Sequence, residues 1–237
     1  MKRYLILVCA LLFTNIVSAR DLTASSWLVA DGTGKVLQGT NVNQVQPIAS
    51  ISKLMTVMIV LDAKQDLTER IGKYTRQQLI DLALVHSDNS AAQMLCDNYV
   101  GGSRSCVSAM NYKAKNLGLP NTSFIEPTGL SVFNVSNATE LIKLVLAANE
   151  YPEINNAAKL AEVKIKLRRK WIVFKNTNPI IGKRHDVLVS KTGFIKASGG
   201  CLVMLLDTDV GQRVVVILGS KNTRTRIPEA EFLIANF

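Results

Sequence analysis

A serine and a lysine three residues apart are the first residues in this sequence with an evident chemical use. Ser50 and Lys53 follow Pro47 and stand at the start of a helical pattern of apolar residues. Residues at this spacing lie on one helix face, so the hydroxyl and the amine can meet. A lysine in a partly desolvated cleft loses its proton near neutral pH and can activate a serine nucleophile. The alternative is a helix cap followed by a surface lysine, because Ser-x-x-Lys alone is a weak motif.

Two further groups carry side chains that suit a binding site. Ser87 and Asn89 place a hydroxyl and a carboxamide two residues apart at the start of a later helical pattern. Lys191, Thr192 and Gly193 come directly after a short predicted strand, where a lysine and a hydroxyl can hold a carboxylate. The glycine allows the backbone of a ligand to approach closely. Each group alone is equally typical of an ordinary helix cap or strand end.

The elements that must position these residues follow from the hydrophobic periodicity. Strand patterns occur near both ends of the chain, and helical patterns occupy its middle. Hairpins at both ends favour an antiparallel sheet of about five strands covered by helices, an α+β fold. The predicted strands are 26–30, 35–37, 163–168, 187–189, 201–207 and 213–219, and the predicted helices are 50 onward, 75–84, 89–99, 104–117, 139–149 and 229–237.

Composition excludes several classes of protein. The 237 residues are 48% hydrophobic and 19% charged, which is typical of a folded core and not of a disordered, collagen-like or coiled-coil chain. Two histidines in the whole chain disfavour a histidine-rich metal site and a Ser-His-Asp triad. The formal net charge of +10 favours polyanionic surroundings without choosing among nucleic acid, acidic lipid and acidic polymer.

The N-terminal residues predict export. Lys2 and Arg3 precede an apolar run at 4–13 and a small-x-small site that ends at Ala19, which is the pattern of a cleaved signal peptide. We therefore expect a signal peptide at 1–19, a single domain at 20–237 and a periplasmic location. The apolar run is too short for a stable membrane anchor.

Three cysteines remain after residue 19. Cys96 and Cys106 flank a predicted turn between two helices, and an oxidising compartment permits a disulfide there. Two reduced cysteines are the open alternative. Cys201 lies on an apolar strand and is expected in the core.

A basic stretch at 164–170 raises the question of nucleic-acid binding. Five of its seven residues are lysine or arginine. Since no aromatic residues are interleaved with them, a solvated strand face is the favoured interpretation and no nucleic-acid partner is expected.

The three groups together are more specific than each alone. Ser-x-x-Lys, Ser-x-Asn and Lys-Thr-Gly, in this order, are the signature of penicillin-binding proteins and class A β-lactamases. The sequence resembles the low-molecular-mass penicillin-binding proteins, the D-alanyl-D-alanine peptidases of the S11 type, and most of all their endopeptidase branch, that of penicillin-binding protein seven. The resemblance covers nearly all of residues 20–237 and includes the blocks 47–56, 87–92, 124–130 and 190–194.

The resemblance implies a serine β-lactamase/transpeptidase-like fold and an acyl-enzyme mechanism. Ser50 would attack the carbonyl of a D-alanyl bond in a peptidoglycan stem peptide. Lys53 would act as the general base, and Ser87 would relay the proton to the leaving amine. β-Lactams would be covalent inhibitors of Ser50. No cofactor and no metal are implied.

The resemblance also implies a substrate-binding set. Asn89 would hold a substrate amide, and Lys191 with Thr192 would hold the leaving carboxylate, beside Gly193. Lys191 would also tune the pKa of Lys53. The backbone N–H groups of Ser50 and Phe194 would form the oxyanion hole. The motifs do not choose between endopeptidase and carboxypeptidase activity.

Two departures and two rival functions stay open on sequence alone. The segment 64–75 is shorter than is usual in the family, so a hairpin lining the cleft is expected to be missing. A β-lactamase is the nearest rival, but Leu130 stands where the deacylating loop of class A enzymes would carry an asparagine, so Glu126 is interpreted as a structural residue. A non-catalytic module that binds peptidoglycan or β-lactams is the second rival.

Overall fold

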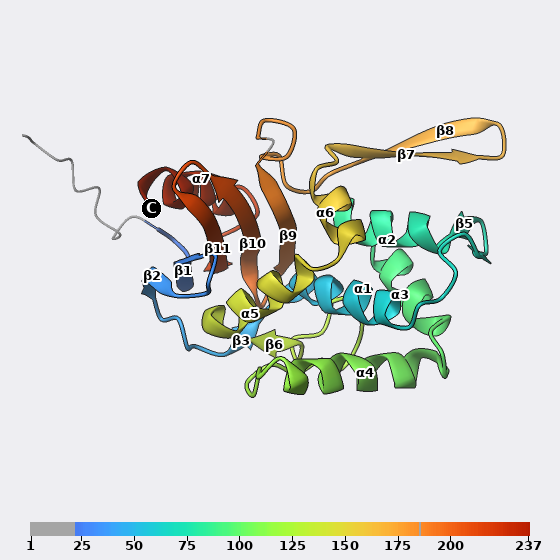
Figure 1. Ribbon diagram of the computed structural model, residues 1–237, viewed down its shortest axis with the longest axis horizontal. Helices are drawn as coiled ribbons and strands as arrows, with labels where there is room; N and C mark the ends of the chain where they lie inside the picture. The colour runs from blue at the N-terminus through green and yellow to red at the C-terminus, as the bar shows by residue number, and fades with distance from the viewer. Residues whose placement is uncertain (1–21, 185) are drawn as a thin grey trace, which may run out of the picture.

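A five-stranded antiparallel sheet forms the centre of the computed structural model, which describes residues 22–184 and 186–237 (Figure 1). The strand order is β2-β1-β11-β10-β9, so strands from both ends of the chain pair side by side. The expected sheet of about five strands is confirmed. The predicted signal peptide at 1–19 and His185 lie outside the described residues. The five strands are β1 (Ser26–Asp31), β2 (Val36–Thr40), β9 (Val187–Ile195), β10 (Gly199–Thr208) and β11 (Gly211–Ser220).

The sheet is apolar on both faces because both are covered. Along β1, Leu28 and Ala30 pack into the core shared with most of the helices, whereas Trp27 and Val29 pack into a second cluster. This second cluster includes Leu233 of α7 (Arg226–Asn236). Successive side chains of a strand point to opposite faces, so a strand buried on both faces shows a continuous apolar run. The closing helix begins three residues before the predicted Glu229.

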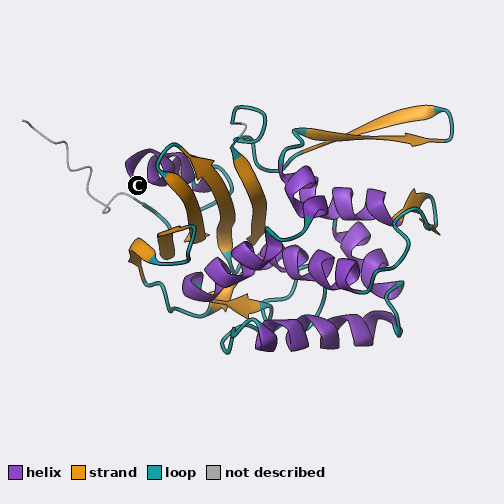
Figure 2. Cartoon of the chain, in the orientation of Figure 1, coloured by secondary structure: helices purple, strands orange, loops and turns teal. Residues whose placement is uncertain are grey.

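Six helices lie on the other side of the sheet, where the helix at 138–148 packs against the strands and most of the others extend beyond them (Figure 2). The sequence predicts five of them, and the short sixth was not predicted. Residues 52–60, in the first of them, are all buried, so this helix lies at the centre of the helical region rather than on its surface. The helices are α1 (Ser52–Asp62), α2 (Arg76–Val85), α3 (Asn89–Asp97), α4 (Gly102–Asn116), α5 (Ala138–Ala148) and α6 (Pro152–Ala158).

Three small two-stranded sheets complete the described chain. The largest is a hairpin that projects from the body of the molecule (Figure 1). The segment 64–75 forms a small hairpin, and whether a cleft-lining hairpin is missing stays a prediction. The pairs are β3 (Gln46–Pro47) with β6 (Val135–Ser136), β4 (Arg70–Ile71) with β5 (Tyr74–Thr75), and β7 (Glu162–Leu167) with β8 (Lys170–Lys175).

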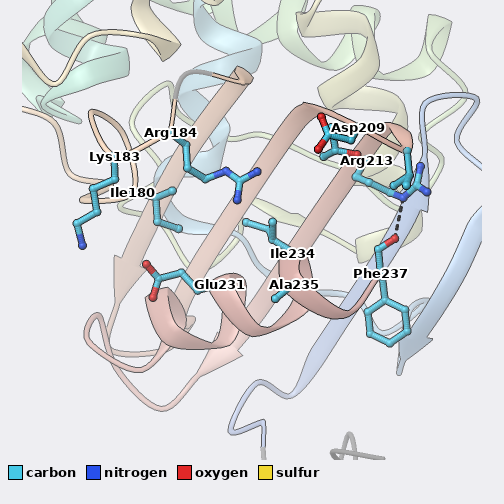
Figure 3. Close-up of a pocket in the computed structure, with 11 residues that line it drawn as sticks. Ile180, Lys183, Arg184, Asp209, Arg213, Glu231, Ile234, Ala235 and Phe237 are labelled. Atoms are coloured by element: carbon cyan, nitrogen blue, oxygen red, sulfur yellow. Dashed lines mark hydrogen bonds between the residues drawn. The ribbon is translucent and has the colours of Figure 1, made fainter. Parts of the chain in front are cut away.

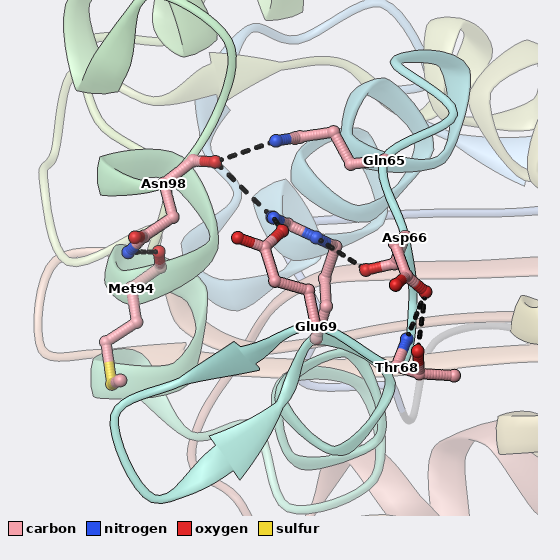
Figure 4. Close-up of polar contacts among 7 residues, drawn as sticks. Gln65, Asp66, Thr68, Glu69, Met94 and Asn98 are labelled. Atoms are coloured by element: carbon pink, nitrogen blue, oxygen red, sulfur yellow. Dashed lines mark hydrogen bonds and ion pairs between the residues drawn. The ribbon is translucent and has the colours of Figure 1, made fainter.

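The buried Arg76 fixes the segment 64–75. Figure 4 shows Gln65, Asp66, Glu69 and Asn98 gathered around these contacts. The Arg76 guanidinium is 2.5 Å from the Glu69 carboxylate and donates to the carbonyl oxygens of Asp66 and Asn98. Gln65 Nε2 donates to the same Asn98 carbonyl at 3.0 Å. These contacts tie the hairpin β4–β5 to the C-terminal end of α3, and they satisfy a charge that burial would otherwise make costly.

Two of the described cysteines form a disulfide, and the third is a free thiol. Cys96 on α3 and Cys106 on α4 form a disulfide, with Cα atoms 5.4 Å apart. Cys201 is free and fully buried on β10, as expected. No helix in the described part of the chain is long and apolar enough to cross a membrane.

The position of the Lys-Thr-Gly group differs from the prediction. The sequence places it after a strand at 187–189, but Lys191 and Gly193 lie inside β9 and pair with Val203 and Cys201 of β10. The apolar pattern stops at Ser190, and this makes the strand look shorter than it is. Its polar continuation is buried, and Lys191 within it belongs to the candidate site described next.

Candidate active site

A tight turn holds Ser50 at the edge of the buried core. It lies in a 3-10 helix at Ala49–Ile51, and α1 begins only at Ser52, two residues later than the sequence predicts. Ala49 has a φ of 47°, a left-handed conformation that is rare for alanine. Ile48, Ala49 and Ile51 are fully buried, whereas Ser50 is half-buried. Such local strain is typical of functional sites.

Lys53 is buried and points at this serine. Its Nζ lies 2.8 Å from Ser50 Oγ, 2.7 Å from Asn89 Oδ1 and 2.5 Å from the carbonyl oxygen of Thr128. Loss of hydration lowers the pKa of Lys53 to about 8, although the charges of Glu126 and Asp88 oppose the shift. A substantial fraction of Lys53 is therefore a neutral amine at mildly alkaline pH.

The three partners of Lys53 fix how the neutral amine is oriented. A neutral amine has two N–H donors and one lone pair. Asn89 Oδ1 and the Thr128 carbonyl oxygen can only accept, so they take the two N–H groups. The lone pair is left for the Ser50 hydroxyl, which can then donate. The arrangement therefore directs the Ser50 proton towards Lys53.

Ser87 and Asn89 reach the site from the loop between α2 and α3. Asp88, between them, caps α3 by accepting a hydrogen bond from the Ala91 N–H at 2.7 Å. Ser87 has a φ of 59°, so the chain turns sharply there. The segment is therefore both a helix cap and a part of the site. Asp88 caps the helix, Ser87 faces Lys191 and Asn89 faces Lys53.

Lys191 is the second buried lysine of the site. Its Nζ lies 2.7 Å from Ser87 Oγ and 2.8 Å from the Thr192 carbonyl oxygen, and the residue is 1% exposed. Burial lowers the pKa of Lys191 well below its usual value, and the nearby charges of Lys53 and Arg226 lower it further. The two ammonium groups repel each other, so protonation of one opposes protonation of the other.

Gly193 brings β9 against the backbone of the serine. A Cβ at this position would lie 2.9 Å from Ser50 N and 3.1 Å from the Ile48 carbonyl oxygen. The sequence assigns this glycine to the approach of a ligand, but the close approach observed is that of the chain to itself. The buried Arg226 donates to the Gly193 carbonyl oxygen at 2.6 Å and holds the strand in place.

Thr192 and Phe194 flank this glycine and point to different environments. Thr192 is buried, and its hydroxyl lies 2.6 Å from the hydroxyl of Thr177. Phe194 is 47% exposed. All eight residues predicted for the site thus come from three segments that converge on Ser50.

The loop at 126–131 is a part of the site that the motifs alone do not indicate. It supplies the Thr128 carbonyl to Lys53. The Glu126 carboxylate accepts hydrogen bonds from Thr128 and from the N–H groups of Gly129 and Ser131. The Glu126 carboxylate therefore stabilises the conformation of the loop, which is the structural role that the sequence suggests. The only sequence signal for this loop is the family block at 124–130.

Gly129 and two buried polar residues hold this loop against the turn at 48–51. Gly129 has a φ of 81°, and a Cβ there would lie 2.0 Å from the Ala49 carbonyl oxygen. Thr56 Oγ1 donates to the Pro127 carbonyl at 2.7 Å, and Asn134 Nδ2 donates to the Glu126 carbonyl at 2.8 Å. The loop and the turn therefore form one packed unit.

A separate cavity of about 400 Å³ lies between α7 and the turn that joins β10 to β11 (Figure 3). Arg213 crosses one end of it and donates to the Phe237 carbonyl oxygen at 2.8 Å. None of the eight predicted site residues lines this cavity.

Comparison with known proteins agrees with the geometry. Residues 13–71 and 65–222 match the Peptidase_S11 family, described as D-alanyl-D-alanine carboxypeptidase. A D-alanyl-D-alanine endopeptidase of Pseudomonas aeruginosa is 38% identical over 89% of this chain and 76% of its own length. One from Escherichia coli is 39% identical over 91% of this chain and 77% of its own. A penicillin-binding protein of Listeria monocytogenes, solved with ampicillin bound, superposes with a TM-score of 0.81 at 25% identity and covers 90% of this chain and 96% of its own.

Proposed function

The chain belongs to the S11 family of D-alanyl-D-alanine peptidases, and we propose that Ser50, Lys53 and Ser87 carry out its chemistry. It is a serine hydrolase that cleaves D-alanyl peptide bonds through an acyl-enzyme. The observation that supports these residues most directly is the 2.8 Å contact between Lys53 Nζ and Ser50 Oγ, with both amine protons committed to carbonyl oxygens.

Acylation proceeds by transfer of the Ser50 proton. Ser50 Oγ attacks the carbonyl carbon of the D-alanyl bond while its proton moves to the lone pair of Lys53. The carbonyl oxygen becomes an oxyanion between the N–H groups of Ser50 and Phe194. When the intermediate collapses, the C–N bond breaks and the leaving amine takes a proton through Ser87. Water then hydrolyses the ester and regenerates Ser50.

Substrate binding is assigned to the other polar groups around Ser50. Asn89 Oδ1 accepts from Lys53, which leaves the Asn89 NH₂ group to donate to a backbone carbonyl of the substrate. Lys191 and Thr192 bind the carboxylate next to the leaving amine. Gly193 acts indirectly, because it lets β9 and its Phe194 N–H approach Ser50.

We assign the finer activity to endopeptidase cleavage of cross-links in peptidoglycan. The two relatives at 38% and 39% identity are named D-alanyl-D-alanine endopeptidases. An endopeptidase converts cross-linked muropeptides into monomers, and a carboxypeptidase removes terminal D-alanine from monomers. Digestion of both substrates followed by mass measurement distinguishes them: loss of terminal D-alanine alone would contradict the assignment.

Labelled penicillin tests the assignment of Ser50. We expect a covalent adduct on a peptide that contains Ser50, and no adduct in the Ser50→Ala protein. β-Lactams are expected to be covalent inhibitors because they present a strained amide to the nucleophile. An adduct elsewhere, or one that persists in Ser50→Ala, would overturn the assignment.

The rival functions make different predictions. In a β-lactamase the adduct would turn over quickly, yet the Glu126 carboxylate already accepts from Thr128, Gly129 and Ser131. We therefore expect slow release, and rapid hydrolysis of a chromogenic cephalosporin would contradict this. A non-catalytic binding module would leave cross-linked muropeptides unchanged.

We assign residues 1–19 to a cleaved signal peptide, residues 20–237 to one domain and the mature protein to the periplasm. The charged and apolar pattern of residues 1–19 supports export. The disulfide between Cys96 and Cys106 supports an oxidising compartment. Mass measurement of the mature protein recovered from the periplasm tests the cleavage after Ala19.

A further inference from the structure

The projecting hairpin β7–β8 has one buried face and one exposed face. Residues paired directly across an antiparallel hairpin share a face. The pairs Val163 with Phe174 and Ile165 with Ile172 form the first face, on which Val163 and Ile165 are buried. This face packs towards α2, which both strands contact. The second face is turned to solvent.

The exposed face combines cations with an aromatic ring. Its cross-strand pairs are Glu162 with Lys175, Lys164 with Val173 and Lys166 with Trp171. Trp171 is 65% exposed and Val173 is 46% exposed. Lys166 Nζ lies 6.0 Å from the centre of the Trp171 ring. The face also carries an acidic residue, Glu162, whose Oε1 lies 3.1 Å from Lys164 Nζ. We call Lys164, Lys166, Trp171 and Val173 the basic–aromatic face.

This composition differs from the sequence-based interpretation of 164–170. The stretch lacks interleaved aromatics when it is read along one strand. The turn at Arg168, which has a φ of 55°, folds the chain back and brings Trp171 next to Lys166. The aromatic residue is therefore supplied by the neighbouring strand, and the face is more than a solvated row of charges.

The base of the hairpin is joined to the candidate active site. His86, next to Ser87, packs its ring edge against Phe174, and its Nδ1 is 3.0 Å from the Lys175 carbonyl oxygen. Thr177, just beyond the hairpin, donates its N–H to the Val85 carbonyl and contacts the Thr192 hydroxyl. The hairpin is therefore in direct contact with the residue that precedes Ser87.

We propose that the basic–aromatic face binds polymeric peptidoglycan and holds an extended substrate in the active-site cleft. This inference rests on the proposed function. Stem peptides carry free carboxylates, which Lys164 and Lys166 can neutralise. The exposed Trp171 offers a flat apolar surface for sugar rings, and exposed tryptophan is typical of binding hot spots. A membrane surface fits less well, because the more apolar face of the hairpin is packed against the protein.

Binding to purified peptidoglycan sacculi tests the proposal. All proteins carry Ser50→Ala, so that the polymer is not digested during co-sedimentation. The face variant is Lys164→Gln/Lys166→Gln/Trp171→Thr. The matched control is Arg104→Gln/Lys115→Gln/Tyr112→Thr, which removes two charges and one exposed aromatic from α4. We expect the face variant to bind roughly tenfold more weakly and the control to bind within about twofold of the parent.

Three further measurements complete the test: penicillin labelling, the salt dependence of sacculus binding, and binding to phosphatidylglycerol vesicles. With Ser50 intact, the face variant should react with labelled penicillin as the parent does, which shows that the fold and the cleft are preserved. The variant Lys164→Gln/Lys166→Gln alone should weaken sacculus binding and reduce its salt dependence. Equal sacculus binding by face variant and control would overturn the proposal. So would a face-dependent interaction found only with phosphatidylglycerol vesicles.

Failure of this inference is distinguishable from failure of the proposed function. Absence of penicillin labelling and of muropeptide cleavage in the unmodified protein would remove the function. Intact labelling and cleavage, with sacculus binding that does not depend on the face, would remove only the inference.

Discussion

The same side chain serves opposite purposes in two regions of this protein. Lys53 and Lys191 are 0% and 1% exposed, and burial lowers the pKa of each. Lys164 and Lys166, on the projecting hairpin, are exposed. With its hydration lost, Lys53 becomes a proton acceptor, whereas the solvated lysines remain flexible, hydrated charges suited to binding anions. Burial or exposure of the amino group, and not the residue type, therefore decides what a lysine does in this protein.

Removal of the buried amine should have the largest effect. We expect Lys53→Gln to slow acylation by labelled penicillin about a thousandfold, because a positioned general base is lost. The exposed counterpart Lys164→Gln serves as the control. Comparable losses in the two variants would break the distinction between the buried and the exposed lysines.

Crowding of the strand that carries Lys191 should have the next largest effect. In Gly193→Ala the new methyl group would meet Ser50 N at 2.9 Å and displace the turn or the strand. We expect acylation to slow about a hundredfold, because small displacements of reacting groups are costly. Circular dichroism and thermal unfolding should show that the variant is folded. Unchanged acylation would show that the close approach of β9 is not needed.

The acylation rate should depend on pH through Lys53. Its pKa is lowered to about 8, so the reactive neutral amine increases as pH rises through that value. Below about pH 8 we expect the rate to fall about tenfold per pH unit. Stopped-flow labelling between pH 6 and 9 measures this, and a flat profile would contradict a neutral Lys53 as the base.

Glu126 offers a smaller and more specific change. Its charge raises the pKa of Lys53, so Glu126→Gln should move the midpoint of the pH profile to a lower pH. The same substitution weakens the support of the loop at 126–131, so we also expect acylation at the plateau to slow about tenfold. A midpoint that moves upward would mean that Glu126 does not act on Lys53 through its charge.

The smallest effect is expected at the exposed lysines. Lys164→Gln and Lys166→Gln should change penicillin acylation by less than about twofold, because solvated charges contribute little at a distance. A larger change would show that the hairpin affects the chemical step directly, and not only the capture of polymeric substrate.

Much of the fold followed from hydrophobic patterns. The runs at 201–207 and 213–219 predict β10 and β11, because strands buried on both faces are continuously apolar. Where burial depends on contacts from elsewhere in the chain, the pattern misleads. β9 continues beyond Val189 through Ser190, Lys191 and Thr192, which are buried by contacts with Asn178, Ser87 and Thr177 from other segments.

The sequence by itself determined the chemistry that is available: a serine and a lysine three residues apart, a hydroxyl with a carboxamide, and a second lysine next to a hydroxyl and a glycine. These depend only on residue type and local spacing. Only the tertiary structure decided which lysines lose their hydration, which carbonyls occupy the protons of Lys53, and that Trp171 stands beside Lys166. Those properties depend on segments far apart in the chain, and local spacing carries no information about them.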